Sequence, residues 1–144
     1  MVVDEASDVP VIAVLTRTPI VMKPKNTVAE AIQKMAEANV GSVVIVDDQM
    51  RPIGIFTERD LLINVCAQGL DPGKVRLEEV MTRDPMVISE GESARKALEL
   101  MLHFGFRHLP VVDDRGRLVG TVSIRDVSQP FAGEVDVEEL HSAG

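Results

Sequence analysis

Tryptophan and tyrosine are absent from the 144 residues, and four phenylalanines leave an aromatic content of 3%. Few rings are therefore present on which nucleic-acid bases could stack. Cysteine occurs once, at Cys66. A single cysteine excludes an internal disulfide framework and a zinc site built from cysteines. Cys66 stands at the end of an expected helix, and we interpret it as a small buried side chain rather than as a nucleophile.

Long hydrophobic runs are also missing. A membrane-spanning helix needs roughly 20 apolar residues, whereas an apolar run such as Val43 to Val46 has only four. The first 13 residues contain three acidic and no basic side chains, which is unlike a secretory signal peptide. We therefore expect a cytoplasmic protein that does not cross a membrane.

Basic residues are outnumbered, with 15 Lys and Arg against 23 Asp and Glu and a net charge of −8 at pH 7. Most of the excess lies in two end segments without Lys or Arg, at Asp4, Glu5, Asp8, Glu134, Asp136, Glu138 and Glu139. The rest of the chain is nearly neutral, so it lacks the basic clusters that bind nucleic acid. We interpret residues 1–11 and 130–144 as acidic end segments and expect no nucleic-acid partner.

An internal duplication is the strongest pattern that is present. Residues 14–61 align on residues 80–127 without a gap at an offset of 66, and 14 of the 48 pairs are identical. The identical residues include Val14, Thr16, Arg17, Pro19, Val21, Val46, Asp47, Asp48, Arg51, Gly54, Arg59 and Asp60. Each repeat is too short to bury a good core alone, so we expect the two to share one core. Any cleft at their seam should come as a quasi-symmetric pair.

Both repeats predict the same order of elements: strand, helix, strand, strand, helix. In the first repeat we expect strands at Ile20 to Met22, Val43 to Val46 and Ile53 to Phe56, a helix capped by Thr27 and Glu30, and a helix from Thr57 to near Gly69. In the second we expect strands at Met86 to Ile88, Leu109 to Val112 and Leu118 to Val122, a helix through Ala94 to Met101, and a short helix from Ser123 that ends before Pro130. Asp47-Asp48 and Asp113-Asp114 are expected to form turns rather than a metal site.

Several motifs in this order resemble the CBS domain pair, or Bateman module. They are Val80-Met81-Thr82-Arg83-Asp84-Pro85, Phe106-Arg107-His108-Leu109-Pro110-Val111-Val112-Asp113, and the twin segments Gly54 to Asp60 and Gly120 to Asp126. The resemblance covers about residues 12 to 128. It implies an α+β fold of two β-α-β-β-α repeats, 12–68 and 77–129, joined by a linker at 69–76 and packed about a pseudo-two-fold axis.

The segment from Thr57 to Asp60 carries the clearest binding chemistry. A strand gives way to a helix there, which favours an anionic group, and the Asp60 carboxylate can accept from both hydroxyls of a ribose diol. Ser123 and Asp126 repeat the arrangement. The same spacing also fits a helix cap without any ligand. From spacing alone, a helix cap is the better interpretation of these residues. The family resemblance favours nucleotide binding instead. The two roles are compatible.

The resemblance implies two clefts between the repeats that hold adenine nucleotides. One cleft would combine Thr57 and Asp60 with Thr82, Met86 and Val87, and the other Ser123 and Asp126 with Thr16, Ile20 and Val21. Val21 and Val87 would offer backbone groups to the adenine edge, and Ile55 or Thr121 would cover its face. Arg107 and His108 would contact phosphate, although His108 could equally be a packed histidine. The two residues align with uncharged Gly41 and Ser42 in the first repeat. We therefore expect the two clefts to bind ligand unequally, and the cleft of Asp126 to bind it more tightly.

No catalytic motif competes with this interpretation, because no histidine stands in a recognisable nucleophile motif and no phosphate-loop signature is present. We therefore expect a non-catalytic sensor of AMP, with ADP and ATP as alternatives, that needs no cofactor or metal. It would form a homodimer and regulate an unidentified protein partner. Two other classes stay open: a scaffolding module with vestigial clefts, and a binder of S-adenosylmethionine, NAD or single-stranded nucleic acid.

Overall fold

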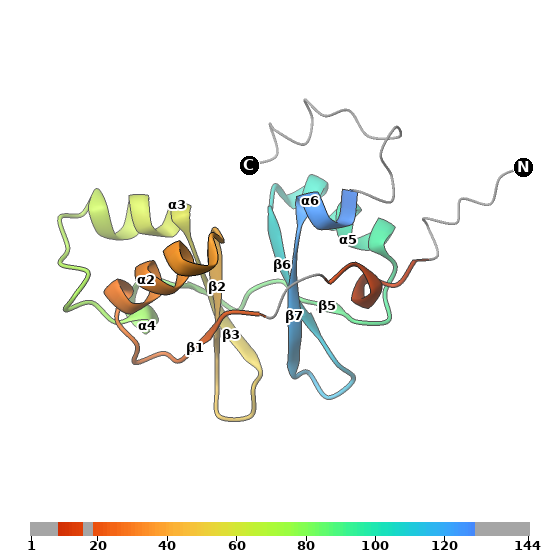
Figure 1. The fold of residues 1–144 in the computed structure, drawn as a ribbon, viewed down its shortest axis with the longest axis horizontal. Coiled ribbons are helices and arrows are strands. Elements are labelled where there is room, and N and C mark those ends of the chain that lie inside the picture. The colour runs from red at the N-terminus through yellow and green to blue at the C-terminus, as the bar shows by residue number, and fades with distance from the viewer. Residues whose placement is uncertain (1–8, 16–18, 129–144) are drawn as a thin grey trace, which may run out of the picture. The chain divides into compact units, whose positions relative to one another are not determined.

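The computed structural model describes residues 9–15 and 19–128, so the expected end segments 1–11 and 130–144 lie almost entirely outside it. Contacts divide the chain into two compact units. Unit 2 contains residues 19–85, and unit 1 contains residues 86–128 together with 9–15. Most elements of each unit are labelled in Figure 1. Each repeat therefore supplies a short leading segment to the unit that is otherwise formed by the other repeat.

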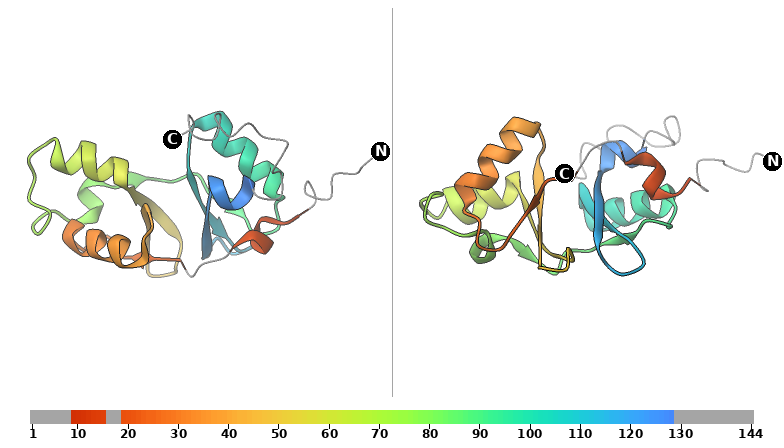
Figure 2. Two further views of the ribbon diagram at one scale, coloured as in Figure 1. Left: turned by 45° about the horizontal axis from the view of Figure 1, so that its top comes forward. Right: turned by 60° about the horizontal axis from the view of Figure 1, so that its bottom comes forward.

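Unit 2 is a four-stranded sheet with helices on one face, as Figures 1 and 2 show. Its strands, in spatial order, are β1 (Val21–Met22), β2 (Ser42–Val46), β3 (Pro52–Thr57) and β4 (Thr82–Arg83). Its helices are α2 (Val28–Ala38), α3 (Glu58–Asp60), the π-helix η2 (Leu61–Cys66) and α4 (Leu77–Val80).

Unit 1 repeats this plan with a three-stranded sheet. Its strands are β5 (Ile88–Ser89), β6 (His108–Val112) and β7 (Leu118–Ser123), and its helices are the 3₁₀ turn η1 (Val11–Val14), α5 (Ala94–Phe104) and α6 (Ile124–Ser128). Helices α5 and α6 lie on the same face of this sheet. The α+β fold class predicted from the sequence is confirmed.

The duplication extends to the register of the strands. Strands β2 and β3 pair antiparallel from Ser42 opposite Thr57 to a shift between Ile45 and Val46. Strands β6 and β7 pair in the same way, from His108 opposite Ser123 to a register shift between Val111 and Val112. Because every pair recurs at the offset of 66, the two strand ends that carry the candidate site residues have the same local geometry.

Helix α2 illustrates why these residues form these elements. Thr27 accepts from the backbone N–H of Glu30 over 3.2 Å, and the Glu30 carboxylate accepts in return from the N–H of Thr27 over 3.2 Å. These N–H groups have no partner within the helix, so the predicted capping box stabilises its start. Val28, Ala31 and Met35 follow at helical spacing and are buried against the sheet.

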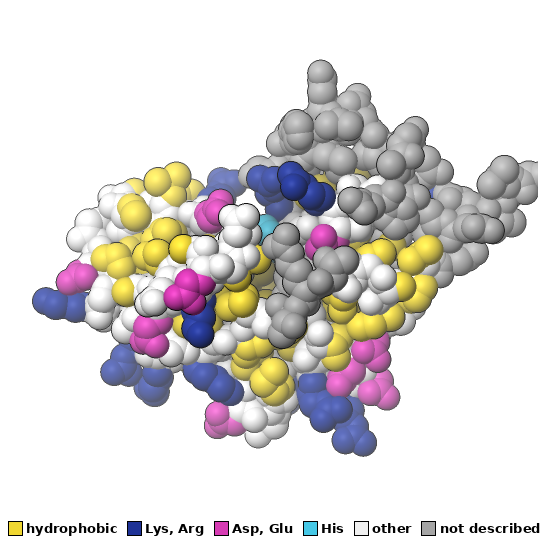
Figure 3. Space-filling view, viewed as in Figure 1, with side chains coloured by type: hydrophobic (Ala, Val, Ile, Leu, Met, Phe, Trp, Pro, Cys, Tyr) yellow, Lys and Arg dark blue, Asp and Glu magenta, His cyan; other side chains and the backbone are white. Residues whose placement is uncertain are grey.

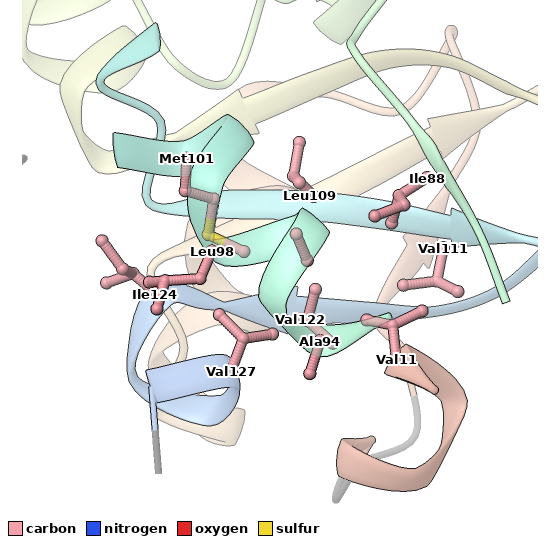
Figure 4. Close-up of a cluster of buried hydrophobic side chains, with 11 residues drawn as sticks. Val11, Ile88, Ala94, Leu98, Met101, Leu109, Val111, Val122, Ile124 and Val127 are labelled. Atoms are coloured by element: carbon pink, nitrogen blue, oxygen red, sulfur yellow. The ribbon is translucent and has the colours of Figure 1, made fainter. Parts of the chain in front are cut away.

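The leading segments were the least predictable part of the fold. Val11 and Leu77, which are 66 residues apart, are both fully buried, Val11 in unit 1 and Leu77 in unit 2. Each is held by a main-chain hydrogen bond, from Val11 N–H to Glu92 over 2.7 Å and from Leu77 N–H to Asn26 over 2.8 Å. Figure 4 shows Val11 among the buried side chains of unit 1.

Three expectations need correction. The buried apolar side chains form two clusters, one in each unit, rather than one shared core. Cys66 is exposed rather than buried, because η2 turns it away from the cluster to which its neighbour Val65 belongs. The strand expected at Met86 to Ile88 begins only at Ile88. The helical segment after Thr57 runs to Cys66 and is closed by a turn at the left-handed Gly69, as expected.

The surface mixes charge and apolar side chains. On the face drawn in Figure 3, Lys and Arg side chains are interspersed with Asp and Glu among the described residues. Within that part of the chain no helix is both long enough and apolar enough to pass through a bilayer.

Candidate functional site

Asp60 is the third residue of the helical segment that follows β3, and its side chain caps the start of that segment. Its Oδ2 atom accepts from the N–H of Thr57 over 3.0 Å and from the Thr57 hydroxyl over 3.2 Å. The N–H of Asp60 donates back to Thr57 Oγ1 over 3.2 Å. The interpretation of this pair as a capping box is thereby confirmed. Such a cap fixes the carboxylate in one rotamer, which leaves its second oxygen in a defined position.

That second oxygen, Oδ1, meets two further donors. The Thr82 hydroxyl donates to it over 3.1 Å, and the amide of Asn64 approaches it over 3.4 Å. The same amide donates to the carbonyl of Val80 over 3.2 Å, so Asn64 links Asp60 to the segment that carries Thr82. Thr82, predicted to share a site with Asp60, lies beside it within unit 2.

Asn64 is a polar contact that sequence reasoning missed. A difference between the repeats could have indicated this contact. At the offset of 66, Asn64 aligns with Pro130, whose side chain has no hydrogen-bond donor. The two aspartates of the duplicated pair therefore differ in the groups that can hold them.

Asp126 repeats the cap of Asp60 in unit 1. Its Oδ2 atom accepts from the N–H of Ser123 over 3.1 Å, and its own N–H donates to Ser123 Oγ over 3.1 Å. Both side chains are half-buried. Thr16, which aligns with Thr82 and was expected near Asp126, lies outside the described residues.

Arg107 and His108 stand at the start of β6, beside the Ser123 to Asp126 turn. The N–H of Ile124 donates to the carbonyl of Arg107 over 2.8 Å, and His108 pairs with Ser123 across the sheet. The Arg107 side chain is exposed and that of His108 is half-buried. Both residues therefore lie beside Ser123 and Ile124, at the start of the helix that carries Asp126.

The residues expected around an adenine ring are divided between the units. Ile20, Val21 and Ile55 belong to unit 2, whereas Met86, Val87 and Thr121 belong to unit 1. Val21 lies in β1, Ile55 is buried in β3, and Val87 is exposed. The pairing of Asp60 with Met86 and Val87, and of Asp126 with Ile20 and Val21, stays a prediction.

The paired aspartates between strands form turns, as expected. Asp47 accepts from the N–H groups of Gln49 and Arg51 over 2.9 and 3.0 Å and from the Arg51 side chain over 2.9 Å. These donors, the Arg51 N–H first, lower the pKa of the Asp47 carboxyl group. Asp113 repeats this turn with Arg115 and Arg117. Among the described residues, no three His, Cys, Asp or Glu side chains are grouped as metal ligands would be.

The sequence model of the CBS domain family matches residues 6–66 and 77–132. This match covers most of the chain, and its two parts correspond to the two sequence repeats, whose strands pair in the same register. The chain belongs to the CBS domain family.

Similar proteins place it among CBS domain pairs. An uncharacterized protein of Methanopyrus kandleri is 41% identical over 129 residues, which are 88% of this chain and 66% of that protein, so the chain spans about two thirds of its length. A CBS domain protein of Pyrobaculum aerophilum, solved in complex with AMP, is 29% identical, with a TM-score of 0.79 over 93% of this chain and 99% of that one.

A second solved structure broadens the range of ligands found in such proteins. It is a CBS domain pair in complex with 5′-methylthioadenosine and S-adenosyl-L-methionine, 30% identical to this chain, with a TM-score of 0.77. The alignment covers 88% of this chain and 98% of that one. The ligands of these two relatives share an adenosyl group and differ at the 5′ position of the ribose.

Proposed function

We propose that this protein is a non-catalytic regulatory module that binds an adenine nucleotide, AMP first and ADP or ATP as alternatives, at Asp60 and Asp126. The observation that carries the proposal is the Asp60 carboxylate, fixed by Thr57 through one oxygen and turned toward Thr82 with the other. The cap of Asp126 by Ser123 repeats it. The similarity to a relative solved with AMP supports this assignment.

A fixed carboxylate suits a ribose because the two ribose hydroxyls are neighbouring donors and an ionised carboxylate only accepts. Each charge-assisted hydrogen bond of this kind contributes roughly 1.5–3 kcal/mol. The Thr82 hydroxyl already donates to Asp60 Oδ1. On ligand binding it would share that oxygen with a ribose hydroxyl, or turn to accept from the ribose.

The expected affinity is moderate. AMP has about 23 heavy atoms, and at roughly 0.3 kcal/mol per atom this gives a binding free energy near 7 kcal/mol. That energy corresponds to a dissociation constant of the order of 10 µM. An affinity in this range would let binding follow changes in nucleotide concentration, as a sensor requires.

An adenosyl thioether or sulfonium is the second candidate ligand. It is favoured by the similarity to a CBS domain pair solved with 5′-methylthioadenosine and S-adenosyl-L-methionine. Recognition by Asp60 or Asp126 would be the same, since it depends on the ribose. The adenosyl group is therefore the shared chemistry, and the 5′ substituent distinguishes the candidates.

The proposal also covers catalysis, cellular location, oligomeric state and protein partner. We infer that the chain catalyses no reaction, acts in the cytoplasm as a homodimer, and conveys ligand binding to a protein partner. Dimerisation, location and partner stay predictions. A chain that lacked all adenosyl binding would instead fit a scaffolding module.

Isothermal titration calorimetry of the full chain with AMP tests the proposal. Asp60→Asn and Asp126→Asn each remove one carboxylate, and the double variant should lose binding. Glu30→Gln is a matched control because Glu30 belongs to an equivalent capping box at Thr27, which is assigned no ligand. Retained AMP affinity in the double variant would reject the proposed site.

A thermal-shift panel of AMP, ADP, ATP, S-adenosylmethionine and NADH separates the ligand classes. A shift with any adenosyl ligand that depends on Asp60 or Asp126 supports nucleotide sensing. No shift with any of them would reject sensing in favour of scaffolding.

A further inference from the structure

The two repeats differ in charge at one equivalent point beside each capped aspartate. In unit 2, the N–H of Glu58 donates to the carbonyl of Gly41 over 3.0 Å. A Cβ atom built on Gly41 would lie 3.5 Å from both Cδ and Oε1 of Glu58. The Glu58 carboxylate therefore occupies the space above Gly41 where a longer residue would place its side chain.

In unit 1 the same main-chain contact joins Arg107 and Ile124 over 2.8 Å. Ile124 aligns with Glu58, and its side chain is buried in the hydrophobic cluster of unit 1 (Figure 4). Arg107 aligns with Gly41 and exposes its guanidinium. The same main-chain contact thus lies beside the carboxylate of Glu58 in unit 2 and beside the guanidinium of Arg107 in unit 1.

We propose that these residues give the two sites different ligand classes. The Asp126 site takes an adenosyl ligand with a 5′-phosphate, which Arg107 binds. The Asp60 site binds AMP more weakly and prefers an adenosyl ligand that is uncharged or cationic at the 5′ position, because Glu58 repels phosphate. This inference rests on the proposed function, since it assumes that both aspartates bind ribose.

The two sites share the group that would bind the ribose. Both have a capping aspartate that accepts from a backbone N–H, so neither the aspartate nor its cap discriminates between ligands. A guanidinium can hold a phosphate through two parallel hydrogen bonds, whereas a carboxylate can donate none and adds a like charge. For partly exposed charges at short range we expect about a tenfold difference in AMP affinity, reduced by salt.

The first test compares AMP with adenosine by titration calorimetry of the full chain. With the Asp126 site disabled by Asp126→Asn, adenosine should bind at least as tightly as AMP. With the Asp60 site disabled by Asp60→Asn, AMP should bind about tenfold more tightly than adenosine. Raising NaCl from 0.05 to 0.5 M should reduce both differences toward equality.

The second test changes the charge at the proposed discriminating residues. In the Asp126→Asn background, Glu58→Gln should raise AMP affinity several-fold and leave adenosine unchanged, whereas the control Glu30→Gln should change neither. Adding Gly41→Arg should raise AMP affinity further; the position has ordinary packing distances to a Cβ, so the variant should fold. In the Asp60→Asn background, Arg107→Gly should remove the preference for AMP.

Three outcomes separate the inference from the function on which it rests. The affinity pattern above supports both. Binding that depends on the aspartates, but with the same AMP-to-adenosine ratio at both sites and no effect of Glu58→Gln, would overturn the charge-based assignment alone. No binding of either ligand would overturn the assignment together with the proposed function.

Discussion

The hydroxyl of Thr82 donates to Oδ1 of Asp60 over 3.1 Å, although the two residues belong to different sequence repeats. Asn64 adds a second link, because its amide reaches both Asp60 and the carbonyl of Val80. Residues from the leading segment of the second repeat thereby complete the polar surroundings of a carboxylate in the first. The exchange of leading segments between the repeats therefore also brings Thr82 beside Asp60 in the candidate site.

Thr82→Val should destabilise the protein by about 1 kcal/mol, because it removes one hydrogen bond to a carboxylate while preserving side-chain shape. The expected measurement is a lower midpoint of urea unfolding at unchanged slope. Thr82→Ser keeps the hydroxyl and is the matched control, with a change of less than about 0.5 kcal/mol. Equal stability of the Val and Ser variants would show that this contact contributes nothing.

Gly54→Ala should destabilise unit 2, because a Cβ at Gly54 would overlap the side chain of Met81. Gly120→Ala should do the same in unit 1, where a Cβ would lie 2.7 Å from Leu15 Cδ1. Overpacking of this kind costs about 1–3 kcal/mol. Thermal unfolding checks it, with Gly91→Ala as the control, since nothing lies within 4 Å of a Cβ there.

The companion variant Gly54→Ala/Met81→Ala isolates the cause. If the Met81 side chain is what resists the new methyl group, adding Gly54→Ala to Met81→Ala should cost much less than adding it to the parent. An undiminished cost would point to the backbone instead.

Leu77→Ala should cost about 2–5 kcal/mol, as expected for truncation of a fully buried leucine. Although Leu77 belongs to the second repeat, the fastest gain in amide hydrogen exchange should appear in residues 19–85, whose cluster it completes. Ile12→Ala is the control, because Ile12 is exposed in the equivalent leading segment. A gain centred on residues 86–128 would contradict the exchange of segments.

Local signals in the sequence predicted most of the regular structure. The capping box of Thr27 and Glu30 and the β-branched run after Ser42 each predict one element from contacts between near neighbours, and both elements are present. The duplication then extended each prediction to the other repeat. The same reasoning placed Thr57 and Asp60 at the start of a helix.

Long-range packing accounts for what the sequence left undetermined. Nothing local in Val11 or Leu77 indicates which repeat will bury it, because an isolated apolar residue fits either sheet. The π-helical turn that exposes Cys66 and directs Asn64 toward Val80 likewise depends on the segment packed beside it. The expectation of one shared core failed for this reason: the repeats depend on each other through exchanged segments and retain separate clusters.

The stabilisation provided by Asp113 should depend on pH. Hydrogen bonds from the N–H groups of Arg117 and Arg115 and from the Arg117 guanidinium lower the pKa of the Asp113 carboxyl group below its unfolded value. A lowered folded-state pKa stabilises the protein above the unfolded pKa of about 3.9, and this contribution is lost as pH falls through the folded-state pKa. In urea unfolding, Asp113→Asn should therefore differ most from the parent near pH 7 and progressively less below about pH 4.

Asp114→Asn is the matched control for this titration, because Asp114 is an exposed neighbour in the same turn. Its substitution leaves the three hydrogen bonds to Asp113 in place, so it should change the free energy of unfolding by less than about 0.5 kcal/mol throughout. A deficit of Asp113→Asn that stayed constant from pH 7 to pH 3 would mean that the lost stability comes from turn geometry and not from the charge. Because Asp47 forms the same turn with Arg51, Asp47→Asn should show the same pH dependence in unit 2.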